Sequence, residues 1–156
     1  MMGSCSSCGD QHPFIQCECR FEVCAQPVHA DPLMFSQRPR ISIPAYLSRL
    51  VQYSRPPSVL ILVILYFLDR MSAIDETFVF DSRTAHRFLL VAMVVACKGL
   101  LDQTLSMREF AKIGGVGVWE LSYLEREFLF RNNWRIFVEP ELLDVYYQSL
   151  LGRTKH

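Results

Sequence analysis

Two uninterrupted apolar runs constrain the fold of this chain more than any other feature of its sequence. They cover residues 59–68 and 88–97, and each is ten residues long. A helix needs about 20 apolar residues to cross a bilayer, so neither run predicts a transmembrane segment. Segments that are apolar on every side are typical of helices buried on every side. A buried strand is the alternative for residues 59–68, but this segment continues to Met71, beyond the usual length of a strand.

Proline, glycine and capping residues divide the remainder of the chain into further predicted helices. Pro44 suits the first turn of a helix. Ser58 is expected to cap the second helix, Asp81 or Ser82 the third, and Gly114 with Gly115 ends the fourth. Helices are predicted over residues 44–53, 59–71, 82–100, 107–113, 118–130 and 141–151. No segment favours a sheet, so the sequence predicts an all-α domain.

Composition narrows the classes of function. The chain has 156 residues, of which 51% are hydrophobic, enough for one domain with a core. Lys+Arg and Asp+Glu both number 16, so the basic excess that is typical of nucleic-acid-binding domains is absent. No basic segment leads into an apolar one at the N-terminus, so no secretory signal is expected. We therefore expect a cytoplasmic or nuclear protein whose six cysteines are thiols or metal ligands rather than disulfides.

Residues 1–33 are expected to form a disordered tail, because they have no sustained hydrophobic period. They contain five of the six cysteines. Zinc binding is one alternative for this tail, since a Cys-x-x-Cys spacing occurs there. Its ligands would be Cys5, Cys8, Cys17 and Cys19.

Lipid attachment is a second alternative for the tail. If translation starts at Met2, Gly3 fits the myristoylation pattern. Palmitoylation of Cys5 would then supply the second anchor that stable attachment to a membrane needs. The protein would in that case be a peripheral membrane protein.

A series of short motifs resembles one protein family. The motifs include Leu65-Tyr-Phe-Leu-Asp-Arg70, Ala96-Cys-Lys98, Phe110-Ala-Lys-Ile-Gly-Gly115 and Leu124-Glu-Arg-Glu-Phe-Leu129. In this order and spacing they resemble the P/U-type cyclins, the group that includes the fungal phosphate-signalling cyclins. The resemblance covers residues 34–138 and implies a five-helix cyclin box there, preceded by the tail and followed by a short C-terminal helix over residues 139–156.

The resemblance also implies a partner and the residues that contact it. A cyclin binds and activates a cyclin-dependent kinase and catalyses nothing itself, so no catalytic residue and no cofactor are expected. Lys98 and Glu125 match the family's kinase-binding positions. An ammonium group donates to main-chain carbonyls and a carboxylate accepts from main-chain N–H groups, and such charge-assisted bonds are strong. The alternative for Lys98 is a solvated helix end that the helix dipole favours.

Two further expectations come from comparing these motifs with the family. Asp69 follows an apolar stretch, so it would need a partner if it is buried. The alternative is that Asp69 and Arg70 form an exposed helix end. The family pairs this aspartate with an arginine, for which Arg40 is the first candidate and Arg49 the second. Gly99 stands where the family usually has an aromatic residue, and it is expected to end the third helix early.

Two other functions remain as alternatives. The first is a cyclin-like scaffold that binds a kinase without activating it. The second is a small helical enzyme, but the predicted core offers almost no convergent acids, bases or metal ligands. The glycines of residues 114–117 lack the Gly-Lys-Ser/Thr of a phosphate-binding loop, and they follow a helix rather than a strand. His86 is expected to be a capping or packing residue rather than a base.

Overall fold

The computed structural model describes residues 31–34 and 39–153. Within these ranges the chain forms helices and no strand, which confirms the predicted all-α class. The helices are α1 (Ile43–Ser54), α2 (Ser58–Ile74), α3 (Ala85–Leu100), α4 (Met107–Gly114), α5 (Val118–Arg131) and α6 (Pro140–Arg153). Residues 32–156 form a unit separate from residues 1–31, and the fold of that unit is described below.

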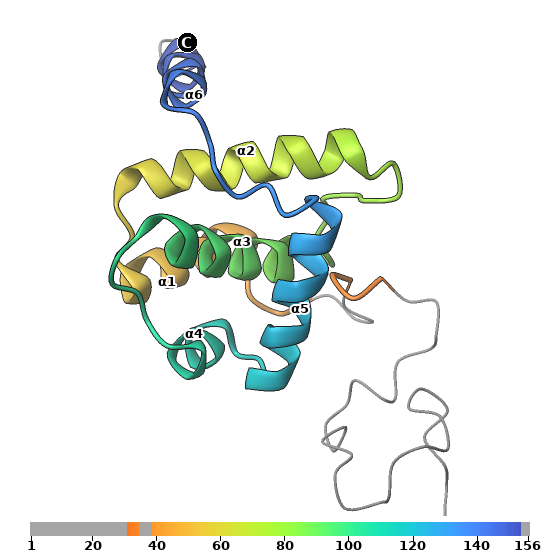
Figure 1. Ribbon diagram of the computed structural model, residues 1–156. Coiled ribbons are helices and arrows are strands. Elements are labelled where there is room, and N and C mark those ends of the chain that lie inside the picture. Colours follow the sequence, from red (N-terminus) through yellow and green to blue (C-terminus); the bar gives the residue numbers. More distant parts are fainter. Residues whose placement is uncertain (1–30, 35–38, 154–156) are drawn as a thin grey trace, which may run out of the picture. The chain divides into compact units, whose positions relative to one another are not determined.

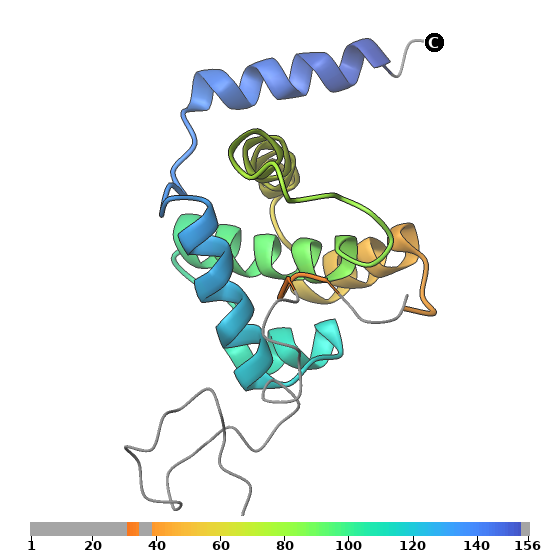
Figure 2. The same ribbon diagram turned by 90° about the vertical axis from the view of Figure 1, so that its right-hand side faces the viewer.

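Helix α3 lies at the centre of this unit, and α1, α2, α4 and α5 pack around it (Figure 1 and Figure 2). Every residue from Ala85 to Cys97 is buried. The apolar run at residues 88–97 therefore forms the central helix, as its all-round hydrophobicity predicts. Aromatic rings join three helices beside it: the ring centroid of Phe128 in α5 lies 5.5 Å from that of Phe67 in α2 and 5.7 Å from that of Phe88 in α3.

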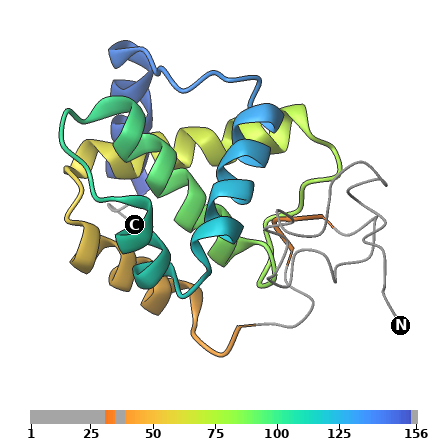
Figure 3. The ribbon, with the colours of Figure 1, turned by 60° about the horizontal axis from the view of Figure 1, so that its bottom comes forward.

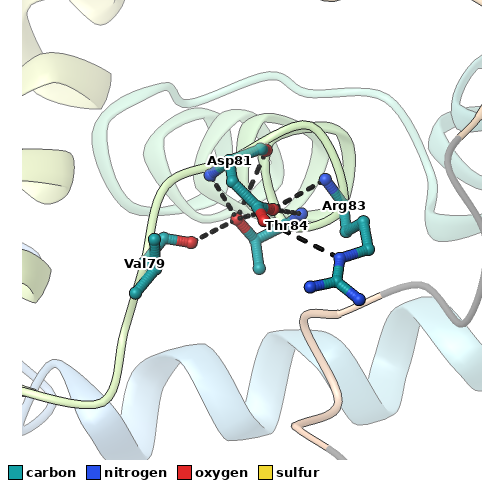
Figure 4. A network of polar contacts seen from close by, with 4 residues as sticks. All are labelled: Val79, Asp81, Arg83 and Thr84. Atoms are coloured by element: carbon teal, nitrogen blue, oxygen red, sulfur yellow. Dashed lines mark hydrogen bonds and ion pairs between the residues drawn. The ribbon is translucent and has the colours of Figure 1, made fainter.

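The start of α3 differs from its prediction. The Asp81 carboxylate accepts hydrogen bonds from the backbone N–H groups of Arg83 (2.7 Å) and Thr84 (3.1 Å), and the Thr84 hydroxyl donates to the carbonyl of Val79 (2.6 Å; Figure 4). These bonds form a turn before the helix, so α3 begins at Ala85 rather than at residue 82. A short polar side chain that bonds the following backbone competes with the helix in this way.

Two other expectations, about the cap of α2 and about Gly99 in α3, are corrected. Ser58 is the first residue of α2 rather than its cap, because Pro57 occupies the N-cap position. Helix α3 continues through Gly99 to Leu100. A Cβ atom at Gly99 would lie 3.0 Å from Cδ1 of Ile136, so the missing side chain makes room for Ile136. By contrast, Gly115 ends α4 at φ 72°, as predicted, in a conformation that favours glycine.

The folded unit includes a short segment before α1. Leu33 is fully buried in the core. The guanidinium of Arg87 in α3 donates to the carbonyls of Pro32 (2.9 Å) and Met34 (3.0 Å). Leu33, which the sequence placed in the tail, thus lies in the core, whereas residues 1–30 of the predicted tail lie outside the described residues.

Helix α6 packs against α2 and has no buried residue (Figure 2). Figure 3 shows that α1 and α4 lie side by side, which agrees with their contacts. Across the described part of the chain, the helices lack the combination of length and apolarity that spanning a bilayer requires.

Candidate functional site

The two predicted binding residues lie together where α3 ends beside α5. Nζ of Lys98 donates to both carboxylate oxygens of Glu125, at 2.7 and 2.9 Å. The side chain of Lys98 is 37% exposed and that of Glu125 is 18% exposed. The packing of α3 on α5 brings the two residues together although 27 positions separate them. The result is a surface ion pair with charge-assisted geometry.

The sequence around each residue explains its position. Lys98 is the first exposed residue after the buried part of α3, near a helix C-terminus where the helix dipole favours a cation. Glu125 follows Leu124, which together with Leu121 and Phe128 forms the buried face of α5. Both side chains therefore lie at the rim of the same contact between helices.

Apolar side chains border this ion pair. Leu100 ends α3 and is more than a third exposed. Leu129, one turn beyond Glu125 on α5, is partly buried, and Ile136 approaches Gly99. Over residues 31–34 and 39–153, no three His, Cys, Asp or Glu side chains gather as metal ligands would. A charged pair beside apolar side chains suits the binding of another protein.

The predicted ion pair between Arg40 and Asp69 is wrong. Asp69 is exposed, and it accepts a hydrogen bond of 2.8 Å from the hydroxyl of Tyr146 in α6. Arg40 is exposed as well, and among the described residues no ion pair joins it to Asp69. The second candidate, Arg49, donates instead to the carbonyl of Lys112 (3.3 Å). The physical reason is that Asp69 lies on the side of α2 that meets α6, not on the side that meets the core.

Comparison with known proteins identifies the family. The family model for cyclins matches residues 15–136. The chain belongs to the cyclin family. The match begins inside the segment predicted as a tail and covers the pair Lys98–Glu125. Cyclins are regulatory, non-catalytic subunits.

Several relatives resemble this cyclin over most of its length. It is 41% identical over 115 residues to the Nuc-1 negative regulatory protein preg of Neurospora crassa, which is 74% of this chain and 24% of that protein. It is 43% identical over 98 residues to the PHO85 cyclin PHO80 of Saccharomyces cerevisiae (63% and 33%), and 31% identical over 113 residues to Cyclin-U4-1 of Arabidopsis thaliana (72% and 56%). These matches confirm the resemblance to P/U-type cyclins, and the chain spans between a quarter and just over half of these relatives' lengths.

A partly buried ion pair of this cyclin was not predicted from the sequence. The guanidinium of Arg87 in α3 donates to the carboxylate of Glu120 in α5, and their side chains are only 8% and 25% exposed. Arg87 lies directly before the long apolar run. This position predicts that its guanidinium is buried and therefore needs an acceptor. The same reasoning was applied to Asp69, which proved to be exposed. A second such pair joins Arg131 to Asp75, at 3.2 Å.

His86 of the cyclin is a packing residue, as expected. It is buried, its Nε2 lies 2.8 Å from the carbonyl oxygen of Ile41, and its ring lies 4.9 Å from the ring of Tyr46. The hydroxyl of Tyr46 donates to the carbonyl of Gly114 (3.0 Å), which ties α1 to α4. Burial raises the pKa of Tyr46. These contacts hold helices together and do not form a proton-transfer site.

The residues proposed for zinc and lipid lie outside the described part of the cyclin. They are Gly3, Cys5, Cys8, Cys17 and Cys19. Cys97 is the one cysteine within the described part of the chain, and it is buried in α3, where burial raises the pKa of its thiol.

Proposed function

We propose that this cyclin binds and activates a cyclin-dependent protein kinase. The observation that carries the proposal is the ion pair Lys98–Glu125, exposed at the junction of α3 and α5 beside apolar side chains. The names of two relatives support the class of partner, since one is a PHO85 cyclin and another is a PHO85 cyclin-like protein. The proposed partner is therefore a kinase of the PHO85 type. We propose that this cyclin acts in the cytoplasm or nucleus, in phosphate or nutrient signalling or in the cell cycle.

The chemistry of the pair suits this task. Lys98 donates to main-chain carbonyls of the kinase, and Glu125 accepts from its main-chain N–H groups. On binding, the Lys98 ammonium and the Glu125 carboxylate exchange part of the hydrogen bonding between them for bonds to the kinase. The number of charge-assisted hydrogen bonds is thereby maintained. Kinase activity requires its regulatory helix to be placed so that a glutamate pairs with the ATP-binding lysine. A cyclin that binds this placement more tightly shifts the kinase toward its active state.

The double variant Lys98→Ala with Glu125→Ala tests the site. We expect its affinity for purified PHO85 kinase to fall at least tenfold, since losing charged interface contacts costs about 2–5 kcal/mol. We expect the free energy of unfolding to change by less than about 1 kcal/mol, because the pair lies at the surface. Lys112→Ala with Glu141→Ala is the matched control. It removes the same two residue types from exposed positions on α4 and α6, and it should leave affinity unchanged.

Each result has a clear meaning. A folded double variant that binds like the unaltered chain would remove Lys98 and Glu125 from the binding site. An unaltered chain that does not bind this kinase would contradict the proposed partner class.

A cyclin-like scaffold remains the second candidate function. It predicts binding to the kinase without a gain in activity. Phosphoryl transfer to a peptide substrate, measured with and without saturating amounts of this chain, separates the two functions. A rise in rate supports activation, and binding without a rise supports the scaffold.

A further inference from the structure

The outward face of α5 carries a stripe of large side chains that the core does not use. The stripe consists of Trp119, Tyr123, Arg126 and Phe130. Trp119 is 59% exposed and Phe130 is 70% exposed, Arg126 is exposed, and Tyr123 is partly covered. The buried face of α5, formed by Leu121, Leu124 and Phe128, lies on the opposite side of the helix. The stripe is therefore a second, separate face of α5.

No described helix covers this stripe. Helix α5 packs against α3 and α4, and it lies at the outside of the helical unit (Figure 1 and Figure 2). The guanidinium carbon of Arg126 lies 5.7 Å from the centre of the Tyr123 ring, which is within the range of a cation–π contact. Apolar side chains exposed together mark a binding surface more often than single ones do.

The spacing of the stripe is symmetric. Its residues follow one another at intervals of four, three and four positions, so the pattern is the same when it is read backwards. Alternating intervals of three and four are also the seam of a coiled coil. Two antiparallel copies of such a seam place the first residue of one opposite the last residue of the other.

We propose that α5 pairs with α5 of a second copy of this chain in an antiparallel, two-fold symmetric contact. Trp119 then faces Phe130 of the second copy, and Tyr123 faces Arg126 of the second copy. Each contact occurs twice, as a two-fold interface requires. The cation–π contact that Arg126 makes within its own chain is repeated between the chains. In the dimer, the ring of Tyr123 therefore meets the cation of Arg126, and the ring of Trp119 meets the ring of Phe130.

The charges beside the stripe permit this contact. Glu120 and Glu127 border the stripe, and an antiparallel pair brings the Glu120 of one chain near the Glu127 of the other. Both carboxylates are already compensated, because Glu120 pairs with Arg87 and Glu127 pairs with Arg131 at 2.8 Å. Their repulsion across the interface is thus reduced.

The area of the stripe predicts a weak dimer. Aromatic side chains bury roughly 150–250 Å² each when fully covered, so the uncovered part of the stripe offers about 400 Å² per copy. A standard stable interface buries about 800 Å² per partner. We therefore expect monomer and dimer to exchange, with the dimer favoured at high concentration. Glu125 lies outside the stripe, so substitutions in the stripe leave the pair Lys98–Glu125 unchanged.

Sedimentation of the full chain over about three decades of concentration measures this equilibrium. The expected molar mass rises from 18.1 kDa toward twice that value. Trp119→Ala with Phe130→Ala should keep the chain monomeric over the same range. The matched control is Trp134→Ala with Phe137→Ala, which removes two other exposed aromatic residues (63% and 71%) outside the stripe and should leave the dimer intact. An unaltered chain that stays monomeric, or a control that abolishes the dimer equally, overturns the proposal.

A complementary pair of variants tests the antiparallel register. Tyr123→Arg places arginine opposite arginine in the dimer, so this variant should not self-associate. Arg126→Tyr supplies two tyrosines, so its mixture with Tyr123→Arg restores both cation–π contacts in a mixed dimer. Titrating fluorescently labelled Tyr123→Arg chains with Arg126→Tyr chains should restore association at least tenfold over titration with Tyr123→Arg chains. Equal association in the two titrations overturns this register. Kinase affinity should be the same in all these variants, so the dimer and the proposed function fail or succeed separately.

Discussion

Single residues in this cyclin take partners that depend on which neighbouring helix they face. Asp69 is an example, because its carboxylate accepts from Tyr146 of α6 instead of pairing with an arginine near α1. Partial burial, together with the charge of Asp69, raises the pKa of Tyr146 from 10.0 to about 12. Asp69 and Tyr146 thus link the last helix to α2.

We predict that Asp69→Ala and Tyr146→Phe each lower the free energy of unfolding by about 0.5–1.5 kcal/mol, the usual contribution of one hydrogen bond. The double variant should cost less than the sum of the two, because both remove the same bond. Urea unfolding of the four proteins in this cycle measures the coupling. If the effect of Asp69→Ala on the free energy of unfolding is coupled to that of Arg40→Ala, and not to that of Tyr146→Phe, this account is contradicted.

The two raised tyrosine pKa values predict a loss of stability at alkaline pH. Both hydroxyls stay protonated to higher pH in the folded chain, because the pKa of Tyr46 and that of Tyr146 lie above the usual tyrosine value of 10.0. The unfolded chain therefore binds fewer protons above pH 10, and the free energy of unfolding falls as pH rises. The contribution of Tyr146 is complete below pH 10.0 and is lost as pH approaches about 12.

Urea unfolding at about pH 9 and about pH 11 checks this expectation. Replacing both tyrosines, by Tyr46→Phe and Tyr146→Phe, should flatten the decline between the two values. Tyr53→Phe is a suitable control, since Tyr53 is an exposed tyrosine. A decline of the same size in the double variant would show that other groups cause it.

At the scale of the helix, the fit of α4 against α3 depends on the absence of one side chain. A Cβ atom at Gly114 would lie 2.8 Å from Cδ1 of Leu90, which is fully buried. We predict that Gly114→Ala lowers the free energy of unfolding by about 1–3 kcal/mol through overpacking. Thermal unfolding measures the effect.

Gly152→Ala is the control for that substitution. Gly152 lies in α6, and a Cβ atom there meets nothing within 4 Å. Alanine is the better helix former by about 0.5–1 kcal/mol, so this variant should be slightly more stable than the unaltered chain. If Gly114→Ala behaves in the same way, α3 accommodates the added methyl group and the close approach has no energetic consequence.

The helices could be predicted from the sequence because their signals are local. The all-round apolarity of residues 88–97 predicted the central helix, and the Gly114–Gly115 pair predicted the end of α4. The predicted start of α3 was wrong because side chains before it bond the backbone and compete with the helix, as Asp81 and Thr84 do. Gly99 was misjudged for a different reason: whether glycine interrupts a helix depends on what packs against it, and Ile136 lies 37 positions later.

Only part of the candidate site could be predicted, since pairing between distant residues is not a local signal. The order of the motifs predicted Lys98 and Glu125 as binding residues. Their ion pair could not be predicted in this way, because it depends on the packing of α3 on α5. Arg87 and Glu120 lie 33 positions apart and carry no mark in the sequence that joins them. A charge next to an apolar run indicates that a partner is needed, but it does not identify the partner.

At the scale of the whole chain, the limit of the folded unit lies at the segment before α1. A chain that begins at residue 35 lacks Leu33 and the two carbonyls, of Pro32 and Met34, that accept from Arg87. We predict that it is less stable than a chain beginning at Pro32 by about 2–5 kcal/mol, as for removal of a buried leucine. Urea unfolding of the two truncated chains measures this difference.

The point variant Leu33→Ala, made in the full chain, is a second measurement of the same effect. We expect it to account for most of the difference between the two truncated chains. We also expect the chain that begins at Pro32 to keep its kinase affinity, because Lys98 and Glu125 are far from this segment in sequence. Loss of that affinity in a folded chain would place part of the binding surface within residues 1–31.

The central position of α3 has a consequence for how the molecule opens. Amides in its buried stretch exchange with solvent deuterium only when the surrounding helices come apart, so their protection should report the global free energy of unfolding. Helix α6 has no buried residue, so we expect it to detach before the other helices. Its amides should exchange first, at low denaturant and without a cooperative transition. Deuterium uptake should therefore proceed from α6 toward α3, which gives this cyclin a layered order of opening.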